Sequence, residues 1–519
     1  MNPPVAPGAA RLAGRGALAL LAGGLVGCSL PPFGPWYLAP LGLAVAAGTI
    51  TRRSVGRRAL CGLLVGIGQF SVGCVWALEF TGLGYVALVA CESLFVTVAF
   101  IAVPPRRGRL IAFAGALTLL EWARDHWPFG GLPLGGTALG QVDGPLAALA
   151  RVGGPLLLVA AVGLAGAGLA ALGSAGWARL STGKPLVKGT ALAGLAAIGL
   201  VALTGGLAAL APGGGPPRAA VAVAIVQGGG RRGMSSLNVP ASHVFAATWR
   251  VTSRLRRPVG LVVWPEDTVA VAGLLAGSIK ADRVATLARR LDTTVLAGVT
   301  APVGSTRFEN EITAWGPSGR IIGSVEKTHP VPFGEYVPLR SLFSRIASLT
   351  GVPRDVVVGR NDGELTTPAG RVAILNSFEA FFADRARSGV RAGGELLVVE
   401  TNTASYASDV VPAAELAASR LQAIAEGRDL VQSATTGYSA LVSPNGVVTR
   451  QSGLGTPDLL RGVVALRTGA TLYERFGDLP VLAGSALAVA LGWALRLAER
   501  DGGALGAWRR RPARRGFVD

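Results

Sequence analysis

The chain has 519 residues, of which 50% are hydrophobic and 15% are charged, and its formal net charge is +19. A soluble globular protein has about 25% charged residues, and the mean hydropathy here is +0.48, so much of the chain must lie outside water. The positive charge does not indicate nucleic-acid binding, because Arg and Lys cluster at the ends of apolar segments and not along a groove with interleaved aromatic residues.

Apolar segments alternate with short polar breaks up to about residue 211, and one more follows near the C-terminus. Each is near the length that crosses about 30 Å of hydrocarbon, although the second and fifth are short. We therefore expect eight membrane-spanning helices, at residues 12–28, 35–50, 59–79, 84–103, 109–122, 152–175, 188–210 and 479–495.

The charges in the breaks predict an orientation. Arg and Lys follow the second, fourth, sixth and eighth segments, whereas the first and third breaks ("SLPPFGPW", "EFTGLG") have none. By the positive-inside rule, both termini are cytoplasmic and the large segment between the seventh and eighth spans lies outside. The residues that carry this pattern are Arg52, Arg53, Arg57, Arg58, Arg106, Arg107, Arg109, Arg179, Lys184, Lys188, Arg496, Arg500, Arg509, Arg510, Arg511, Arg514 and Arg515.

The N-terminal third holds all four cysteines, and none forms a CxxC pair or lies near a histidine. We therefore expect neither a structural zinc site nor a disulfide framework. The stretch "LVGC", which ends at Cys28, is similar to a lipoprotein cleavage site. Because further spans follow, we favour a first transmembrane helix that contains Gly-Cys over a cleaved signal.

A Gly/Pro linker, "APGGGPPR", separates the first seven spans from a segment with the composition of a soluble α/β domain. Short β-rich runs ("AVAVAIVQG", "VGLVVWPED", "TTVLAGVT", "GRVAILNSFE", "GELLVVETN") alternate with helical patterns, and "ENEITAWGPSGRIIGSVEKTH" indicates a hairpin. We expect three parts: a transmembrane part at 1–211, an α/β domain at 219–478, and a final helix with a basic tail at 479–519.

Three polar residues end strands of this domain. Glu266 ends "LVVWPE", Lys327 ends "RIIGSVEK", and Ser377 follows "RVAILN". A carboxylate, an ammonium and a hydroxyl at adjacent strand ends would supply a base, an oxyanion stabiliser and a nucleophile for acyl transfer. Each position also has a plain interpretation, as a capping Glu, a surface Lys and a Ser that bonds the backbone.

The motifs around these residues resemble a known family. "VVWPED", "EKTHPVPFGEYVP" and "SFE" are similar to the nitrilase (carbon–nitrogen hydrolase) superfamily, and "AIVQG", "ETN" and "RLQAIAEGRDLVQSATTGYSALVSPNGVV" extend the likeness. Together with "PPFGPW", "GQFSVGCVWAL" and "EWARDHWPFGG" in the N-terminal part, they resemble the apolipoprotein N-acyltransferase family.

This resemblance implies a multi-pass protein of a bacterial plasma membrane with an extracytoplasmic α-β-β-α sandwich domain and no cofactor or metal. It implies transfer of an acyl chain from a phospholipid to the α-amino group of a diacylglyceryl-cysteine apolipoprotein, through an acyl-enzyme. By position, Glu266 is the general base, Lys327 stabilises the oxyanion, Ser377 occupies the nucleophile position, and Glu335 and Glu379 are supporting carboxylates.

The sequence departs from the family at several of these positions. The family's nucleophile is a cysteine, whereas here it is Ser377, and the α/β segment contains no cysteine. A serine hydroxyl is far less acidic than a thiol and needs a base. His329 is near in sequence, but it lies two residues after Lys327. "TNTASYAS" at 401–408 lacks the family's Trp-Phe-Gly, and Leu134 replaces a frequent Trp.

Three functions remain open from the sequence alone. The first is acyl transfer through a serine ester in place of a thioester. The second is a catalytically weak or silent relative that binds lipoproteins or lipids, or that assists a partner enzyme. The third is a serine hydrolase of lipids or amides, which would keep the first half-reaction and lose the second.

Overall fold

The computed structural model describes residues 7–50, 54–105, 107–182, 188–345 and 352–509. Its helical part consists of seven helices before the first strand and one long helix after the last. These are α1 (Pro7–Cys28), α2 (Leu38–Thr49), α3 (Val55–Gly73), α4 (Gly82–Ala102), α5 (Arg109–His126), α6 (Ala150–Thr182), α7 (Lys188–Ala209) and α14 (Leu479–Arg509). Short 3₁₀ helices η1 (Val75–Glu79), η2 (Thr137–Gln141) and η3 (Ala147–Leu149) lie in the connections.

Helices form at all eight segments that the apolar pattern predicts. Within the described residues, four are long and apolar enough to cross a membrane, at Gly82–Ala102, Ala147–Ser181, Lys188–Ala209 and Leu479–Glu499, and two shorter apolar helices lie at Gly14–Cys28 and Leu38–Thr49. The third predicted span, 59–79, is divided, because α3 ends at Gly73 and η1 completes the segment. The Cys28 motif is the last turn of α1.

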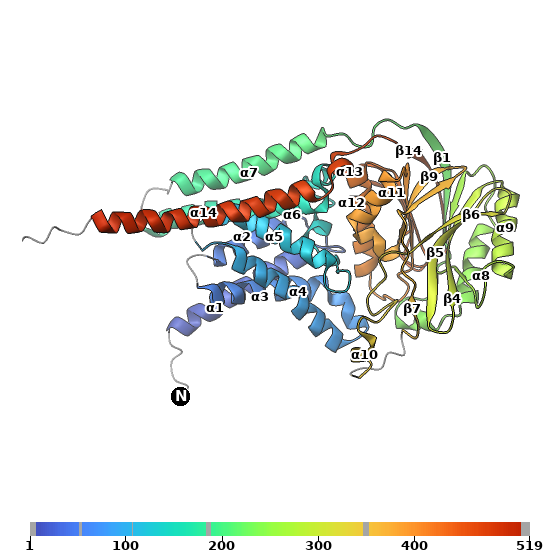
Figure 1. The fold of residues 1–519 in the computed structure, drawn as a ribbon, viewed down its shortest axis with the longest axis horizontal. Helices are drawn as coiled ribbons and strands as arrows, with labels where there is room; N and C mark the ends of the chain where they lie inside the picture. The colour runs from blue at the N-terminus through green and yellow to red at the C-terminus, as the bar shows by residue number, and fades with distance from the viewer. Residues whose placement is uncertain (1–6, 51–53, 106, 183–187, 346–351, 510–519) are drawn as a thin grey trace, which may run out of the picture.

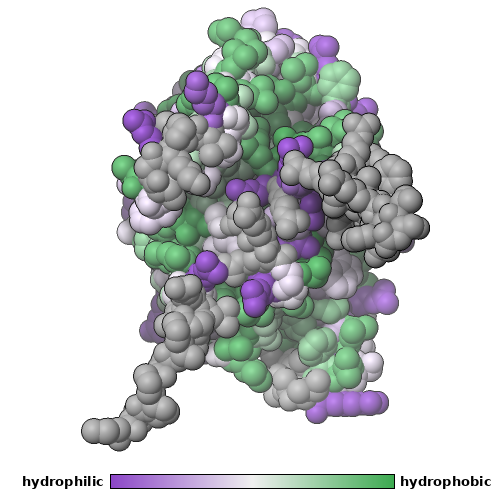
Figure 2. Space-filling view, turned by 90° about the vertical axis from the view of Figure 1, so that its left-hand side faces the viewer, coloured by the Kyte–Doolittle hydropathy of each residue, from purple (hydrophilic) through white to green (hydrophobic). Residues whose placement is uncertain are grey.

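The flanks of this helical part are apolar. Figure 2, which views the molecule from the end of the helical part, shows hydrophobic side chains gathered over its sides, with hydrophilic residues among them. On α7 alone, five leucines are more than half exposed: Leu192, Leu195, Leu200, Leu203 and Leu207. Such a continuous apolar flank suits lipid and not water, and the chain is a membrane protein.

Two β-sheets form the second part. The first sheet has the order β14-β1-β2-β4-β5-β6, with β3 on β4 and β7 on β5, and the second has the order β13-β12-β11-β10-β9-β8. The strands are β1 (Ala219–Gln227), β2 (Leu261–Val263), β3 (Val269–Ala270), β4 (Thr294–Val303), β5 (Arg307–Trp315), β6 (Ile321–Glu326), β7 (Asp355–Val356), β8 (Glu364–Thr367), β9 (Gly370–Asn376), β10 (Leu396–Thr401), β11 (Leu430–Ala434), β12 (Ala440–Val442), β13 (Val448–Gln451) and β14 (Asp458–Leu466).

The two sheets pack face to face and helices cover their outer faces (Figure 1). Val223, Leu296, Ile374 and Val398 belong to the apolar core between the sheets. Helices α8 (Ala241–Thr252) and α9 (Ile279–Leu291) lie outside the first sheet, and α11 (Ala383–Arg391) and α12 (Val410–Glu426) lie outside the second; short helices η4 (Met234–Asn238), η5 (Ser377–Phe381), α10 (Arg340–Phe343) and α13 (Leu472–Phe476) complete the part. This is the predicted α-β-β-α sandwich.

Helix α12 lies between the second sheet and the membrane helices (Figure 1). One side of α12 belongs to a buried core shared with α6, to which Ala414, Ala418 and Leu421 of α12 and Leu158 of α6 contribute. Its other side packs on the sheet, through Leu416 and others. The helix is therefore buried on both sides, although it belongs to the α/β part of the chain.

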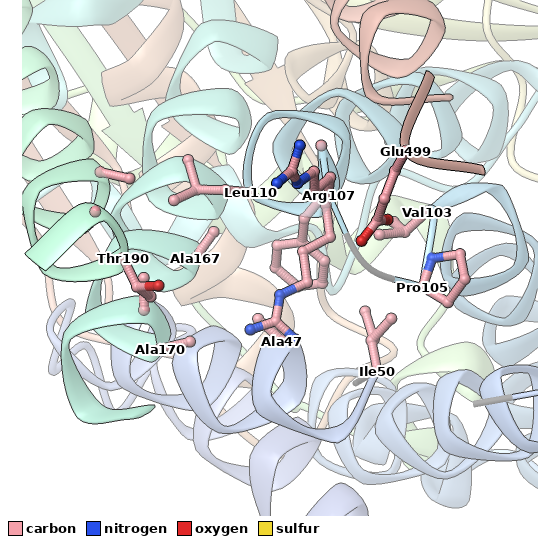
Figure 3. A pocket seen from close by; sticks show the side chains of 16 residues that line it. Ala47, Ile50, Val103, Pro105, Arg107, Leu110, Ala167, Ala170, Thr190 and Glu499 are labelled. Carbon is pink, nitrogen blue, oxygen red and sulfur yellow. The ribbon is translucent and has the colours of Figure 1, made fainter. Parts of the chain in front are cut away.

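A cavity of about 510 Å³ is lined by residues of the helical part alone (Figure 3). The labelled residues show that it lies among α2, α5, α6, α7 and α14, with Arg107 and Glu499 among mostly apolar side chains. None of the residues that the sequence marks as catalytic lines it.

The sheets are joined by a fully hydrogen-bonded buried amide, Gln227 at the end of β1. Its Nε2 donates to the carbonyls of Gly453 (2.7 Å) and Thr456 (2.9 Å), and its Oε1 accepts from the hydroxyls of Ser439 (2.7 Å) and Ser452 (2.8 Å). Every hydrogen-bonding capacity of the side chain is therefore used inside the protein.

Gln227→Leu should destabilise the α/β part by about 2–4 kcal/mol, because a leucine of similar size leaves two carbonyls and two hydroxyls without their partner. The measurement is thermal unfolding of the detergent-solubilised protein. Gln451→Leu, at an exposed position of β13, is the control and should change the midpoint little. An unchanged midpoint for Gln227→Leu would contradict this role of the amide.

Candidate active site

The structure brings together strand ends from both sheets. Glu266 follows β2 and Lys327 follows β6 in the first sheet, whereas Ser377 follows β9 in the second. Within the first sheet, Gly298 on β4 allows Glu266 to lie close to this strand, because a Cβ at Gly298 would be only 2.4 Å from the Cα of Glu266. The three predicted residues therefore belong to one region of the sandwich, and all three are buried.

Lys327 lies at the centre of a buried ion cluster. Its Nζ is 2.9 Å from Oε1 of Glu266 and 2.8 Å from Oε1 of Glu335, and the side chain of Lys327 is 1% exposed. Burial alone would lower the pKa of Lys327, but the charges of Glu266 and Glu335 outweigh burial and raise it. The ammonium is therefore a permanent positive charge, which suits the stabilisation of an oxyanion.

For the pKa of Glu266, burial outweighs the neighbouring charge. Burial raises the pKa of its carboxyl, and the charge of Lys327 opposes that rise. A carboxylate with a raised pKa is a better proton acceptor than one in water. Glu335 completes the cluster and is anchored by a hydrogen bond from the backbone N–H of Val331 to its Oε2 (2.7 Å).

Asn310 links the cluster to the second sheet, and the sequence analysis missed it. Its Nδ2 donates to Glu266 (2.9 Å) and Glu335 (2.8 Å), and its Oδ1 accepts from Nδ2 of Asn376, the residue before Ser377 (2.9 Å). The predicted hairpin contained the signal, because the β5–β6 register places Asn310 beside Lys327, whose N–H donates to the Asn310 carbonyl (2.9 Å).

Ser377 lies at a sharp turn between β9 and the 3₁₀ helix η5. Its φ is +54°, a left-handed value that is uncommon for residues other than glycine. A strained strand-to-helix turn presents a side chain away from the sheet, the geometry of known nucleophile turns, although the local sequence is not GxSxG. Ser377 is 9% exposed, so the hydroxyl is nearly enclosed.

The hydrogen bonds of Ser377 lead toward α12. Its Oγ is 3.1 Å from Oγ1 of Thr401, at the end of β10, and 3.5 Å from Oε1 of Glu415 on α12. Within the described parts of the chain, no hydrogen bond joins Ser377 directly to Glu266, Lys327 or His329. The sequence analysis assigned no role to Thr401 or Glu415.

A stripe of polar residues on α12 could have revealed Glu415. Glu415, Ser419, Gln422 and Glu426 recur at helical spacing on one face, and all are at most 2% exposed. A polar stripe usually marks the solvent side of a helix. Here it faces the second sheet, as the hydrogen bond from Ser419 to Gln432 on β11 shows (2.6 Å), because α12 has membrane helices on its other side.

Glu379 links the loop after β6 to the turn after β9. Its Oε1 accepts from the N–H (2.6 Å) and hydroxyl (2.7 Å) of Thr328, and its Oε2 accepts from the N–H of Asn376 (2.9 Å) and from Nε of Arg385 (3.2 Å). Burial would raise its pKa, but hydrogen bonding from His329 and the charge of Arg385 lower it to about 2. Glu379 therefore remains a carboxylate with a structural role.

His329 belongs to the Glu379 side of the loop. Its Nδ1 is 3.0 Å from Oγ1 of Thr328 and 3.9 Å from Oε1 of Glu379, and its ring stacks on Phe382 at 4.3 Å between centroids. The imidazole therefore contacts Thr328, Glu379 and Phe382 and is not placed to act as a base for Ser377. This agrees with its position two residues after Lys327.

An apolar cluster lies between the site and the membrane helices. Leu134, Phe378, Phe382 and Val411 form it, with Trp76 and Tyr406 packed against them. The segment 401–408, which lacks the family's Trp-Phe-Gly, contributes Tyr406, whose ring meets that of Trp76 at 5.9 Å between centroids.

Glu79 fixes this segment to the helical part. The backbone N–H groups of Ala407 (2.5 Å) and Ser408 (3.1 Å) donate to its carboxylate. The two departures at Leu134 and at 401–408 therefore meet in one buried apolar cluster, which includes Phe378, the residue after Ser377.

Glu379→Gln should lower the free energy of unfolding by roughly 3 kcal/mol at pH 7, the equivalent of a carboxyl pKa that is about 2 when folded and about 4.3 when unfolded. A lowered folded pKa stabilises above the unfolded pKa, so the difference between wild type and variant should shrink as the pH falls from about 5 toward 2. The measurement is thermal unfolding across this pH range. Glu364→Gln, in a partly exposed pair with Arg371, is the control; a pH-independent difference for Glu379→Gln would refute the prediction.

The family models match most of the chain. Residues 22–168 match the apolipoprotein N-acyltransferase N-terminal domain, and residues 223–471 match the carbon–nitrogen hydrolase domain. Among solved structures, an amidase from Nesterenkonia sp. aligns over 50% of this chain and 94% of its own, with 17% identity and a TM-score of 0.37.

Some curated relatives match over nearly their whole length and others, such as that of Geobacter metallireducens (46% of its length), over part of it. The chain is 31% identical over 514 residues to the apolipoprotein N-acyltransferase of Azotobacter vinelandii, covering 93% of this chain and 95% of that one. It is 26% identical over 508 residues to that of Photobacterium profundum, covering 90% and 92%. The chain belongs to the apolipoprotein N-acyltransferase family.

Proposed function

We propose that this protein transfers an acyl chain from a membrane phospholipid to the N-terminal α-amino group of a diacylglyceryl-cysteine apolipoprotein, through an ester on Ser377. The observation that carries the proposal is the buried Glu266–Lys327–Glu335 cluster beside a strained strand-end serine, in a chain of this family. A buried ammonium between two carboxylates adds little to folding stability, because its desolvation costs several kcal/mol even when it is paired, so the cluster is better explained by chemistry than by stability.

The reaction has two half-reactions. In the first, Oγ of Ser377 attacks an ester carbonyl of the phospholipid and its proton passes to a carboxylate of the site, while Lys327 stabilises the oxyanion. Glu266, protonated at the start, gives its proton to the departing oxygen, so that the lysophospholipid leaves as an alcohol. In the second, the α-amino group attacks the serine ester and Glu266 takes a proton from the amine, which restores its acid form. The first carboxylate returns its proton to Oγ as the tetrahedral intermediate collapses to the N-acylated lipoprotein and Ser377. Glu335 and Glu379 hold Lys327 and the two loops in place.

The same proposal includes the arrangement in the membrane. Residues 1–211 and 479–519 form the membrane part with both termini in the cytoplasm, and residues 219–478 form an extracytoplasmic catalytic domain. The alternation of Arg and Lys between breaks supports this orientation. The apolar cluster of Leu134, Phe378 and Tyr406 connects the site to the membrane helices, and this nearness to the membrane supports lipid as the donor.

Covalent labelling tests the proposal directly. Incubation of the membrane protein with a phospholipid labelled in its acyl chain should place label on Ser377, since the first half-reaction ends in an ester. Label should be absent in Ser377→Ala and should pass to an added diacylglyceryl-cysteine peptide. Mass spectrometry of the Ser377 peptide gives the readout. Absence of label on wild type would indicate a binding or assisting protein, and label that passes only to water would indicate a hydrolase.

Ser377→Cys should raise transfer to the peptide by about tenfold or more. A thiol of pKa near 8.5 is the better nucleophile, and a thioester is more reactive toward an amine than an oxyester. The measurement is the rate of N-acyl peptide formation at saturating phospholipid. Ser439→Cys, a buried serine that contacts Gln227 and not this site, is the matched control. A slower Ser377→Cys protein would mean that the site has adapted to oxygen.

A further inference from the structure

We propose that Thr401 and Glu415 form a relay that removes the proton of Ser377, so that this site carries a base for an oxygen nucleophile besides Glu266. The inference deepens the function proposed above and rests on it. It starts from the chemical problem that the serine raises, which is that a hydroxyl needs a base within reach when it attacks.

The hydrogen bonds determine the direction of the relay. The hydroxyl of Thr401 donates to the carboxylate of Glu415, at 2.7 Å from Oε1 and 2.8 Å from Oε2. A threonine hydroxyl has one proton, so its oxygen is left to accept, and the hydroxyl of Ser377 at 3.1 Å is the donor. The proton of Ser377 therefore points to Thr401 and away from the substrate side.

The path from Ser377 through Thr401 to Glu415 is short and buried. Thr401 is 0% exposed and Glu415 is 2% exposed. The direct distance of 3.5 Å from Ser377 to Glu415 is long for a hydrogen bond between oxygens, whereas both steps through Thr401 are within normal reach. Glu415 thus acts through Thr401.

Burial also prepares the carboxylate for this role. It raises the pKa of Glu415 to about 7, against the hydrogen bond from Thr401, and the charge of Glu266 adds to the rise while that of Lys327 opposes it. A base is most effective when its pKa lies near the working pH. Glu266, in contrast, already holds Lys327 and Asn310 through its Oε1.

As Oγ of Ser377 forms its bond to the acyl carbon, its proton passes to Oγ1 of Thr401, and the Thr401 proton passes to Glu415, which becomes a neutral acid. Glu266 starts as the acid and gives its proton to the departing lysophospholipid oxygen. When the amine later displaces the serine, Glu266 takes the amine's proton, and the proton of Glu415 returns through Thr401 to Oγ, which leaves as a hydroxyl. Both carboxyl groups then have their starting protonation.

A fluorophosphonate probe tests the relay independently of lipid transfer, because it reports how readily Ser377 attacks phosphorus with loss of fluoride. We measure its labelling rate on Ser377 in the detergent-solubilised full chain, against Ser377→Ala as background. Glu415→Gln and Thr401→Val should each lower the rate by about 100-fold, the scale of general-base catalysis. Thr401→Ser, which restores the hydroxyl, should return the rate to within about threefold of wild type.

Two further arms separate a relay from a structural role. Glu426→Gln removes another buried carboxylate from the same face of α12, far from Ser377 along the helix, and should leave the labelling rate unchanged. In the Ser377→Cys background, Glu415→Gln should not slow alkylation by iodoacetamide, because a thiol ionises without the relay.

The outcomes are distinct. Equal loss in the serine and cysteine backgrounds, no loss with Glu415→Gln, or no labelling of wild-type Ser377 above background would each overturn the relay. Normal relay behaviour with the probe, combined with no acyl label from phospholipid, would leave the relay standing and overturn the proposed acyl transfer.

Discussion

The ammonium of Lys327 is the constraint on which the rest of the site depends. A charge this deeply buried is tolerated only if carboxylates and hydrogen bonds surround it, and Glu266, Glu335 and the amide of Asn310 meet this need. Because these groups come from β2, β5 and the loop after β6, the ends of these strands must converge. Asn310 then carries the constraint to the second sheet through Asn376, which places Ser377 beside the cluster.

Serine in place of cysteine changes what the surrounding residues must do. A thiol can be deprotonated by its environment, whereas a hydroxyl keeps its proton until the moment of attack. In the proposed mechanism, the first sheet supplies Lys327 for the oxyanion and Glu266 for the amine. The residues that contact Ser377 itself come from β10 of the second sheet and from α12. The proposed chemistry is thus divided between the two sheets.

Sequence patterns predicted the elements well but predicted only part of the site. Buried parallel strands such as β2 and β9 read as apolar runs that end in polar residues, so the positions of Glu266 and Ser377 at strand ends were visible. The hairpin also defined which residue lies beside Lys327, although Asn310 was not recognised. Glu415 could not be found in this way, because its polar stripe on α12 predicts a solvent face. Only the packing of α12 against α6 shows that this face is turned inward.

The position of α12 also bears on how the protein can be divided. Ala414, Ala418 and Leu421 of this helix are covered by membrane helices, while Glu415 on the same helix reaches the nucleophile. A catalytic domain expressed without the membrane part would present that apolar side to water and would lose the support that sets the depth of the carboxylate. The membrane part is therefore a structural component of the site. Removing it would produce an α/β fragment that aggregates through the exposed side of α12 and whose Glu415 is displaced.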